Sequence, residues 1–290
     1  MVILVTAWML LATAQPVDHA ALGRDFYDRG FRAYMEGRGD QMRECYTAAA
    51  REFEAAGMKA EQALALRGLT FAPALTFAEK DALLSKALTL AVQAKSTKVE
   101  ALVLHQWGDM LFGQGDYDRA LKHTERAASI FERMNDTVSL ARALTSLGRL
   151  FHIQGSTSVA IATYERVLTL QKQSGDVLGE AQTHTAIGAV LVQSNRATEA
   201  LPHYALALDL VEKNGGGKIQ INFQRAAYAM GLGNAGEFAR AAELMTQVID
   251  ADPTADDVPL YYRSLAFDLA GRAIKEIGLF LPSAFCLLIN

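Results

Sequence analysis

Apolar residues recur along this chain at the three-to-four spacing of one helix face. Leu104, Trp107 and Leu111 form one such set. The set returns forty residues later as Leu144, Leu147 and Phe151. Apolar positions at this spacing predict an amphipathic helix. Their return at a fixed interval predicts a stacked array of similar helical units, in which each unit buries its apolar face against the next.

Small residues follow the same forty-residue interval. Glycine occupies one position of successive repeats, at residues 68, 108, 148 and 188, and alanine occupies another, at residues 120, 160 and 200. Small side chains allow two helices to approach closely, and a larger residue such as Tyr164 or Tyr204 fills the space beside them. Each repeat is therefore expected to be a hairpin of two antiparallel helices.

Two breaks interrupt the helical pattern in each repeat. The first contains Gly115 or Gly236, and glycine can adopt a positive φ angle in a tight turn without a steric penalty. The second contains Asn135, Gly175 or Gly215, and we expect helix ends there. The first break separates the two helices of a hairpin, and the second separates one repeat from the next.

The pattern resembles the tetratricopeptide repeat, most clearly at Gly115-Asp116-Tyr117-Asp118-Arg119-Ala120. The resemblance implies an all-α, right-handed superhelical solenoid of antiparallel helix hairpins over residues 20–290. It implies about seven repeats, the last incomplete, starting near residues 23, 61, 101, 141, 181, 222 and 264. The forty-residue period predicts helices about one turn longer than usual, as in certain scaffold proteins and in bacterial proteins with a C-terminal CHAT peptidase domain. The first two repeats match less well, because Arg29, Arg67 and Lys80 stand where the family prefers apolar or small residues.

The N-terminal segment, residues 1–14, is similar to a signal peptide. An uncharged apolar run from Val2 to Leu11 precedes the small residues Ala12-Thr13-Ala14, although no Lys or Arg comes before the run. Cleavage would place the protein outside the cytoplasm, in the periplasm or beyond; otherwise the segment is an N-terminal helix of a cytoplasmic protein. The run is too short to span a bilayer.

The final stretch, residues 285–289, is apolar and is not followed by a polar capping helix. Solenoids usually end in such a helix. The chain is therefore either a fragment of a longer protein or packs its end against a partner, which could be a second copy.

Composition narrows the functional classes. The chain of 290 residues is 51% hydrophobic and 21% charged, so it can bury a large core. Its formal net charge of −4 disfavours binding to phosphate backbones. The glycine-rich stretch at 214–218 lacks the strand and the Ser or Thr of a phosphate loop, so it predicts a turn between repeats. The aspartates at 250–257 lack the pattern of a calcium loop and predict an acidic turn.

Neither the cysteines nor the histidines suggest a catalytic or metal site. Cys45 and Cys286 lie far apart in the sequence, so each is expected to be a small buried residue. No two histidines have metal-ligand spacing on one helix. We expect His184 in the core, hydrogen-bonded, and His123 and His203 in solvent. The sequence thus predicts no enzyme, no cofactor and no metal.

The resemblance also implies a binding groove, because positions two, five, nine and twelve of each first helix line it in this family. The candidate groove residues in this chain are Arg24, Tyr27, His105, Asp109, Phe112, Arg142, Thr145, Arg149, His152, Gln182 and Thr185. The same positions also include Leu102, Ala189 and Val192.

Arg142 and Arg149 lie two turns apart on one helix face and could bind the carboxylates of an acidic peptide. They could equally pair with nearby acids or face water. Phe112 is either a peptide anchor or a core residue. The function expected is a non-catalytic scaffold that binds a protein or peptide in the groove. The alternatives are the regulatory arm of a longer protein, such as a CHAT-type peptidase, and a self-assembling structural element.

Overall fold

A computed structural model describes residues 17–250, 268–270 and 272–273 of the chain. Throughout these residues the secondary structure is helical, without strands, and twelve helices follow one another in order. Most of them have 17 residues, as the forty-residue period predicted. The predicted signal segment, most of the seventh repeat, Cys286 and all the aspartates of the acidic turn except Asp250 lie outside the described residues.

The chain divides into two compact units that meet between Met134 and Asn135. The helices of the first unit are α2 (His19–Met35), α3 (Gly39–Ala55), α4 (Lys59–Leu69), α5 (Phe77–Gln93), α6 (Thr97–Gly113) and α7 (Tyr117–Arg133). The helices of the second unit are α8 (Thr137–Ile153), α9 (Thr157–Ser174), α10 (Val177–Gln193), α11 (Ala197–Lys213), α12 (Lys218–Asn234) and α13 (Phe238–Asp250).

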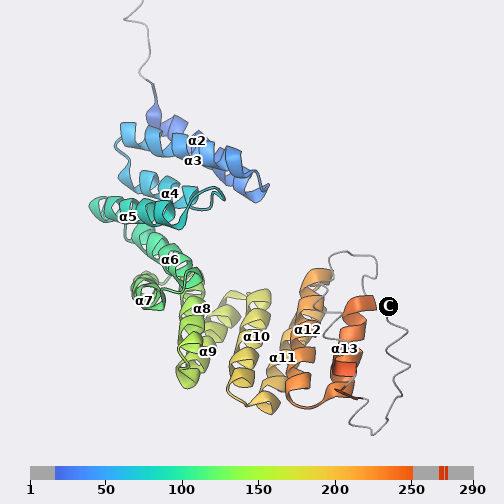
Figure 1. Cartoon of the computed structure of the whole chain (residues 1–290). Helices are drawn as coiled ribbons and strands as arrows, with labels where there is room; N and C mark the ends of the chain where they lie inside the picture. Colours follow the sequence, from blue (N-terminus) through green and yellow to red (C-terminus); the bar gives the residue numbers. More distant parts are fainter. Residues whose placement is uncertain (1–16, 251–267, 271, 274–290) are drawn as a thin grey trace, which may run out of the picture. The chain divides into compact units, whose positions relative to one another are not determined.

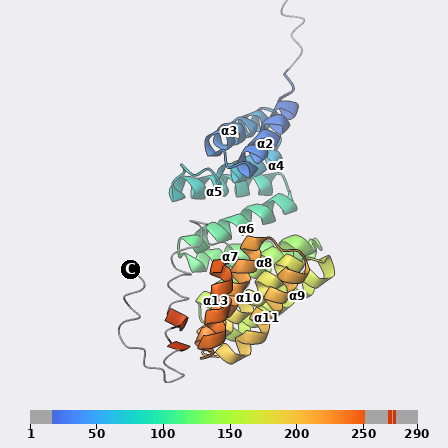
Figure 2. The same cartoon turned by 90° about the vertical axis from the view of Figure 1, so that its right-hand side faces the viewer.

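Consecutive helices pair as antiparallel hairpins within each unit. The pairs are α2 with α3, α4 with α5, α6 with α7, α8 with α9, α10 with α11 and α12 with α13 (Figure 1). Each hairpin also packs on the next one within its unit, and Figure 2 shows the hairpins of the first unit stacked from α2 to α6. The expected all-α solenoid of helix hairpins is thus confirmed within each unit. The even-numbered helices are the first helices of the predicted repeats.

The predicted turns have the expected backbone geometry. Within hairpins, Gly115 and Gly236 have φ angles of 82° and 85°. Between hairpins, Asn135, Gly175 and Gly215 have φ angles of 55°, 70° and 71°. Positive φ at these positions ends one helix and redirects the chain into the next. The glycine-rich stretch at 214–218 is accordingly a turn between α11 and α12.

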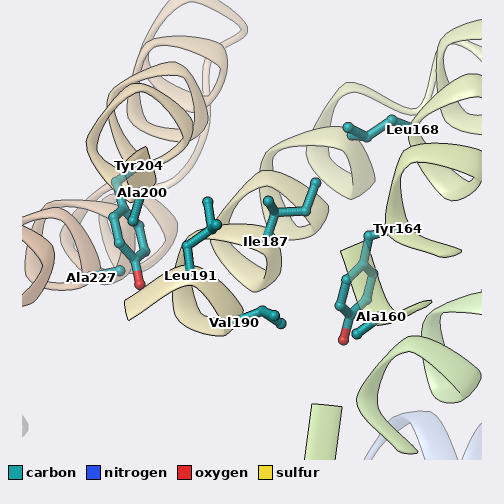
Figure 3. Close-up of a cluster of buried hydrophobic side chains, with 9 residues drawn as sticks. All are labelled: Ala160, Tyr164, Leu168, Ile187, Val190, Leu191, Ala200, Tyr204 and Ala227. Carbon is teal, nitrogen blue, oxygen red and sulfur yellow. The ribbon is translucent and has the colours of Figure 1, made fainter. Parts of the chain in front are cut away.

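The core of the second unit forms where the forty-residue spacing brings small and large residues together. Figure 3 shows the buried rings of Tyr164 and Tyr204 on either side of α10, which contributes Ile187, Val190 and Leu191 between them. A Cβ atom added at Gly188 would lie 2.7 Å from Cζ of Tyr204. The absence of a side chain at Gly188 is therefore what allows the Tyr204 ring to lie between α10 and α11.

Helix α4 departs from the repeat. It has only 11 residues and ends at Leu69, and residues 70–76 connect it to α5. Pro73 in this connection cannot donate the backbone hydrogen bond of a helix interior, which disfavours continuation of α4. Helix α5 then begins with a capping box, in which the Thr76 amide donates to Glu79 at 2.7 Å and the Glu79 amide donates to the Thr76 hydroxyl at 3.3 Å. The shorter helix accounts for the 38-residue spacing between the starts of α4 and α6.

Candidate binding face of the first helices

In the first unit, the predicted groove residues of α2 border a small cavity. Arg24 and Tyr27 line a space of about 170 Å³ together with Phe53 and Leu64. The Tyr27 ring also packs edge-on against the ring of Tyr46, with 5.4 Å between centroids. Burial raises the pKa of Tyr27, so its hydroxyl stays protonated. Tyr27 is therefore partly a packing residue.

The predicted groove residues of α6 contact one another or a neighbouring turn. His105 Nε2 lies 3.6 Å from Asp109 Oδ2. Phe112 is half-buried, with its ring centroid 5.6 Å from that of Tyr117. One part of the Phe112 surface thus packs against Tyr117, and the other part remains accessible.

Two exposed aromatic residues of α2 were missed by the sequence reasoning. Phe31 is 52% exposed and Tyr34 is 44% exposed, and the Tyr34 ring lies 5.0 Å from that of Phe71. Phe31 and Tyr34 occupy positions nine and twelve of the first repeat. The same rule that selected Arg24 and Tyr27 would have found them if it had been applied to the whole helix.

In the second unit, α8 presents a basic surface. Arg142 and Arg149 are exposed, whereas Leu144, Leu147 and the other apolar positions between them are buried. Arg142 has no ion-pair partner among the described residues, and the charge of Arg149 acts on the buried Tyr164. The two remaining candidates of this helix lie partly buried between neighbours: the Thr145 hydroxyl donates to the Ala141 carbonyl at 2.9 Å, and His152 is half-buried.

A cavity of the second unit lies on the first-helix face between α10 and α12. Its volume is about 530 Å³, within the range of about 300–1,000 Å³ that is typical of ligand pockets. Both predicted groove residues of α10, Gln182 and Thr185, line it. The other lining residues are Leu178, Ala186, Ala189, Val211, Ile219, Gln220, Phe223 and Gln224. None of the lining residues is charged.

Three apolar side chains of this cavity are unusually exposed. Leu178 is 39% exposed, Phe223 is 50% exposed and Ile219 is 87% exposed. Leu178 and Ile219 occupy equivalent places in the first turn of α10 and α12, and Val138 occupies the same place in α8, where it is 52% exposed. This turn lies before the predicted repeat starts at 141, 181 and 222, so the sequence scheme of four groove positions excluded it.

A buried polar pair connects the two walls of the cavity. The Thr185 hydroxyl of α10 donates to Oε1 of Gln224 in α12 at 2.5 Å. Gln224 is only 3% exposed, and its amide nitrogen has no acceptor among the described residues. The Gln224 amide nitrogen therefore has N–H donors that no described residue accepts. Gln220 is already engaged, because its Oε1 accepts from the Gly217 amide at 3.0 Å.

Three further histidines lie between first and second helices. His184 of α10 is buried, as predicted, and its Nδ1 lies 3.0 Å from Nδ1 of His203 in α11. The expectation that His203 and His123 lie in solvent is wrong. His203 packs against His184, and the His123 ring stacks on Trp107 with 4.6 Å between centroids. Both histidines are partly covered because a large ring of the neighbouring first helix, Trp107 or His184, packs against them.

Within the described residues, no group of three His, Cys, Asp or Glu side chains could hold a metal ion. Among the same residues, no helix combines the length and the apolar character that a membrane span requires. Cys45 is a free, buried cysteine. The cavity between α10 and α12 is where two predicted groove residues and three exposed apolar residues gather.

Comparisons with known proteins agree with this geometry. Residues 99–173 match the family model described as "Tetratricopeptide repeat". The comparison with curated protein sequences gives no significant match.

Several solved structures share the fold. BtubC from P. vanneervenii is 14% identical, with a TM-score of 0.58 over 83% of this chain and 93% of that one. PilF from Pseudomonas aeruginosa is 17% identical, with a TM-score of 0.58 over 86% of this chain and 99% of that one. A Rap protein complexed with the Competence and Sporulation Factor is 12% identical, with a TM-score of 0.61 over 92% of this chain and 81% of that one.

The matched segment, residues 99–173, begins in α6 and ends in α9. It therefore contains the hairpin α6–α7 and the hairpin α8–α9, which are the third and fourth repeats predicted from the sequence. The hairpins on either side have the same two-helix form and the same small residues at the helix contact. Residues 99–173 therefore match the tetratricopeptide repeat family, and the other described hairpins share the fold of that segment.

Proposed function

We propose that this protein is a non-catalytic scaffold that binds a protein or peptide partner through the first-helix face of its second unit, formed by α8, α10 and α12. The observation that carries the proposal is the uncharged cavity between α10 and α12. Exposed apolar residues gathered at a concave site, with a few polar groups among them, are typical of a binding surface. Gln182 and Thr185, expected in the groove from the sequence, line this cavity.

Two further observations support binding over catalysis. The cavity lining has no nucleophile paired with a base and no carboxylate, which general acid–base chemistry would need. One structure of similar fold is a Rap protein complexed with the Competence and Sporulation Factor. A fold of this kind can therefore hold a partner, and the cavity is the place where this chain would do so.

Site-specific photo-crosslinking tests the proposal. A benzoylphenylalanine introduced in place of Gln182, which is exposed and lines the cavity, is expected to capture a discrete partner in the native cell. The matched control replaces Ala162, an exposed residue of the second helix α9, with the same group. Capture at Gln182 but not at Ala162 supports the proposal. Equal capture at both sites, or none at Gln182, contradicts it.

A further inference from the structure

The cavity between α10 and α12 also indicates which chemistry its partner has. We infer that the partner is an extended peptide segment that places an apolar side chain in this cavity and an acidic side chain on Arg142 of α8. The inference rests on the proposed function and makes it specific. It follows from three features of the second unit: the uncharged cavity walls, the amide donors of Gln224 and the absence of acidic residues from the groove positions of α8, α10 and α12.

The apolar side chain is required by the cavity walls. Leu178, Ile219 and Phe223 together expose apolar surface at a concave site, and nothing charged lies among the lining residues. A charged side chain placed there would lose its hydration without gaining a partner. A leucine, isoleucine, methionine or phenylalanine would instead remove apolar surface from water on both sides of the contact.

The extended conformation is required by the amide groups. The Gln224 amide nitrogen offers donors to the cavity, and the exposed Gln182 amide offers both a donor and an acceptor. An extended peptide has free backbone carbonyl and N–H groups that can pair with these amides. A helical ligand has already used its backbone groups within the helix.

The acidic side chain is required by the charges on the face. In α8, α10 and α12 the groove positions contain Arg142 and Arg149 but no Asp, Glu or Lys. Arg142 on α8 occupies the same repeat position as Gln182 on α10, and it is exposed without an ion-pair partner among the described residues. A carboxylate that reaches it forms a charge-assisted hydrogen bond that the free protein lacks.

A random dodecapeptide library displayed on phage, selected on the full chain, tests the inference. The enriched peptides are expected to share an apolar residue and at least one Asp or Glu. For the best peptide, Phe223→Ser and Arg142→Glu are each expected to weaken binding about tenfold, measured by fluorescence anisotropy. A peptide whose acidic residue is changed to lysine is expected to bind Arg142→Glu better than it binds the original chain.

Two control variants show that these losses are local. Val159→Ser removes a side chain of 49% exposure from the second helix α9, which matches Phe223 in exposure. Lys122→Glu reverses an exposed charge on α7. Both are expected to bind the peptide normally, and circular dichroism verifies that all four variants stay folded.

Three results would overturn the inference. The enriched peptides could lack acidic residues, or the best peptide could bind Phe223→Ser as tightly as the original chain. The selection could also enrich no peptides on the original chain beyond those it enriches on Phe223→Ser. If crosslinking at Gln182 nevertheless captures a partner, the scaffold function stands and only the ligand chemistry is wrong. If crosslinking also fails, the proposed function itself is wrong.

Discussion

A Cβ atom added at Gly148 of α8 would lie 2.6 Å from Cε1 of Tyr164 in α9. Tyr164 is 1% exposed and belongs to the core of the second unit, so its ring has little room to move. Gly188 and Tyr204 repeat this contact one hairpin later. The pair of a glycine and a facing tyrosine therefore fixes how closely the two helices of a hairpin approach.

Replacement of Gly148 by leucine is expected to destabilise the protein by about 1–3 kcal/mol, because the new side chain overpacks the hairpin against Tyr164. The matched control is Gly113→Leu, since a Cβ atom at Gly113 would meet nothing within 4 Å. Gly113→Leu is expected to be neutral or stabilising, as leucine favours the helix over glycine. Urea denaturation followed by circular dichroism measures both. Equal midpoints for the two variants would show that the predicted repeat register is wrong.

The sequence predicted this contact because a forty-residue period encodes packing directly. Only a position that faces its partner helix in every repeat requires a small residue every time, and Gly148 and Gly188 satisfy that requirement. The turns were predictable for a similar reason, since Gly115 and Asn135 adopt positive φ angles that few residues tolerate. The hairpins and their boundaries therefore follow from local chemistry.

Only some of the residues that line the cavity could be predicted from the sequence. Gln182 and Thr185 follow from the groove positions of the family, but Leu178 and Ile219 lie in the added first turn, which those positions do not include. The burial of Gln224 depends on Thr185 of the neighbouring hairpin. Contacts between repeats of different sequence leave no periodic signal, so the polar pair and the cavity became visible only in three dimensions.

The Thr185–Gln224 pair is expected to couple α10 to α12. Thr185→Val removes the hydroxyl that donates to Oε1 of Gln224, a residue that is only 3% exposed. Oε1 of Gln224 is then left without this donor. The expected cost is about 1–3 kcal/mol in the free energy of unfolding. Gln224→Met is expected to cost less, because the Thr185 hydroxyl can still donate to the Ala181 carbonyl, 3.1 Å away.

A double-mutant cycle measures this coupling. The variant that combines Thr185→Val with Gln224→Met is expected to be about as stable as Gln224→Met alone, since no buried oxygen is then left unpaired. Strict additivity of the two single substitutions in urea denaturation would show that the hydrogen bond contributes nothing.

Filling the cavity is expected to abolish partner capture without loss of stability. Ala189 is exposed and lines the cavity, so the indole of Ala189→Trp can occupy the space that a ligand side chain would take. In the crosslinking experiment at Gln182, this variant is expected to lose the captured partner while its melting temperature stays within a few degrees. Ala162→Trp on the second helix α9 is the control. Undiminished capture with Ala189→Trp would place the binding site elsewhere on the chain.

The stability of the protein is expected to fall as the pH drops from about 6.5 to about 4. Burial lowers the pKa of His184 to about 4, and the nearby His203 and Lys172 act in the same direction. Burial also lowers the pKa of His203, against the opposing charge of Glu165. Glu180 lies 3.9 Å from His184 Nε2 and is itself 3.6 Å from Lys172.

The direction of this change in stability follows from whether the folded or the unfolded chain binds more protons. A histidine in the unfolded chain titrates near pH 6.5. Below that pH the unfolded chain binds protons that His184 and His203 do not bind in the folded chain, because their pKa values are lowered there. The folded pair also needs one ring to donate and the other to accept across 3.0 Å, which is impossible when both nitrogens carry hydrogen. Stability is therefore complete above about pH 6.5 and declines toward about pH 4.

Urea midpoints measured across this pH range check the prediction. The variant that carries both His184→Gln and His203→Gln is expected to show a shallower decline, because glutamine does not titrate. A residual decline is expected from His123, whose pKa is also lowered by burial and by the charges of Arg119 and Arg126. A decline as steep as that of the unaltered protein would show that the acid sensitivity arises outside the α10–α11 contact.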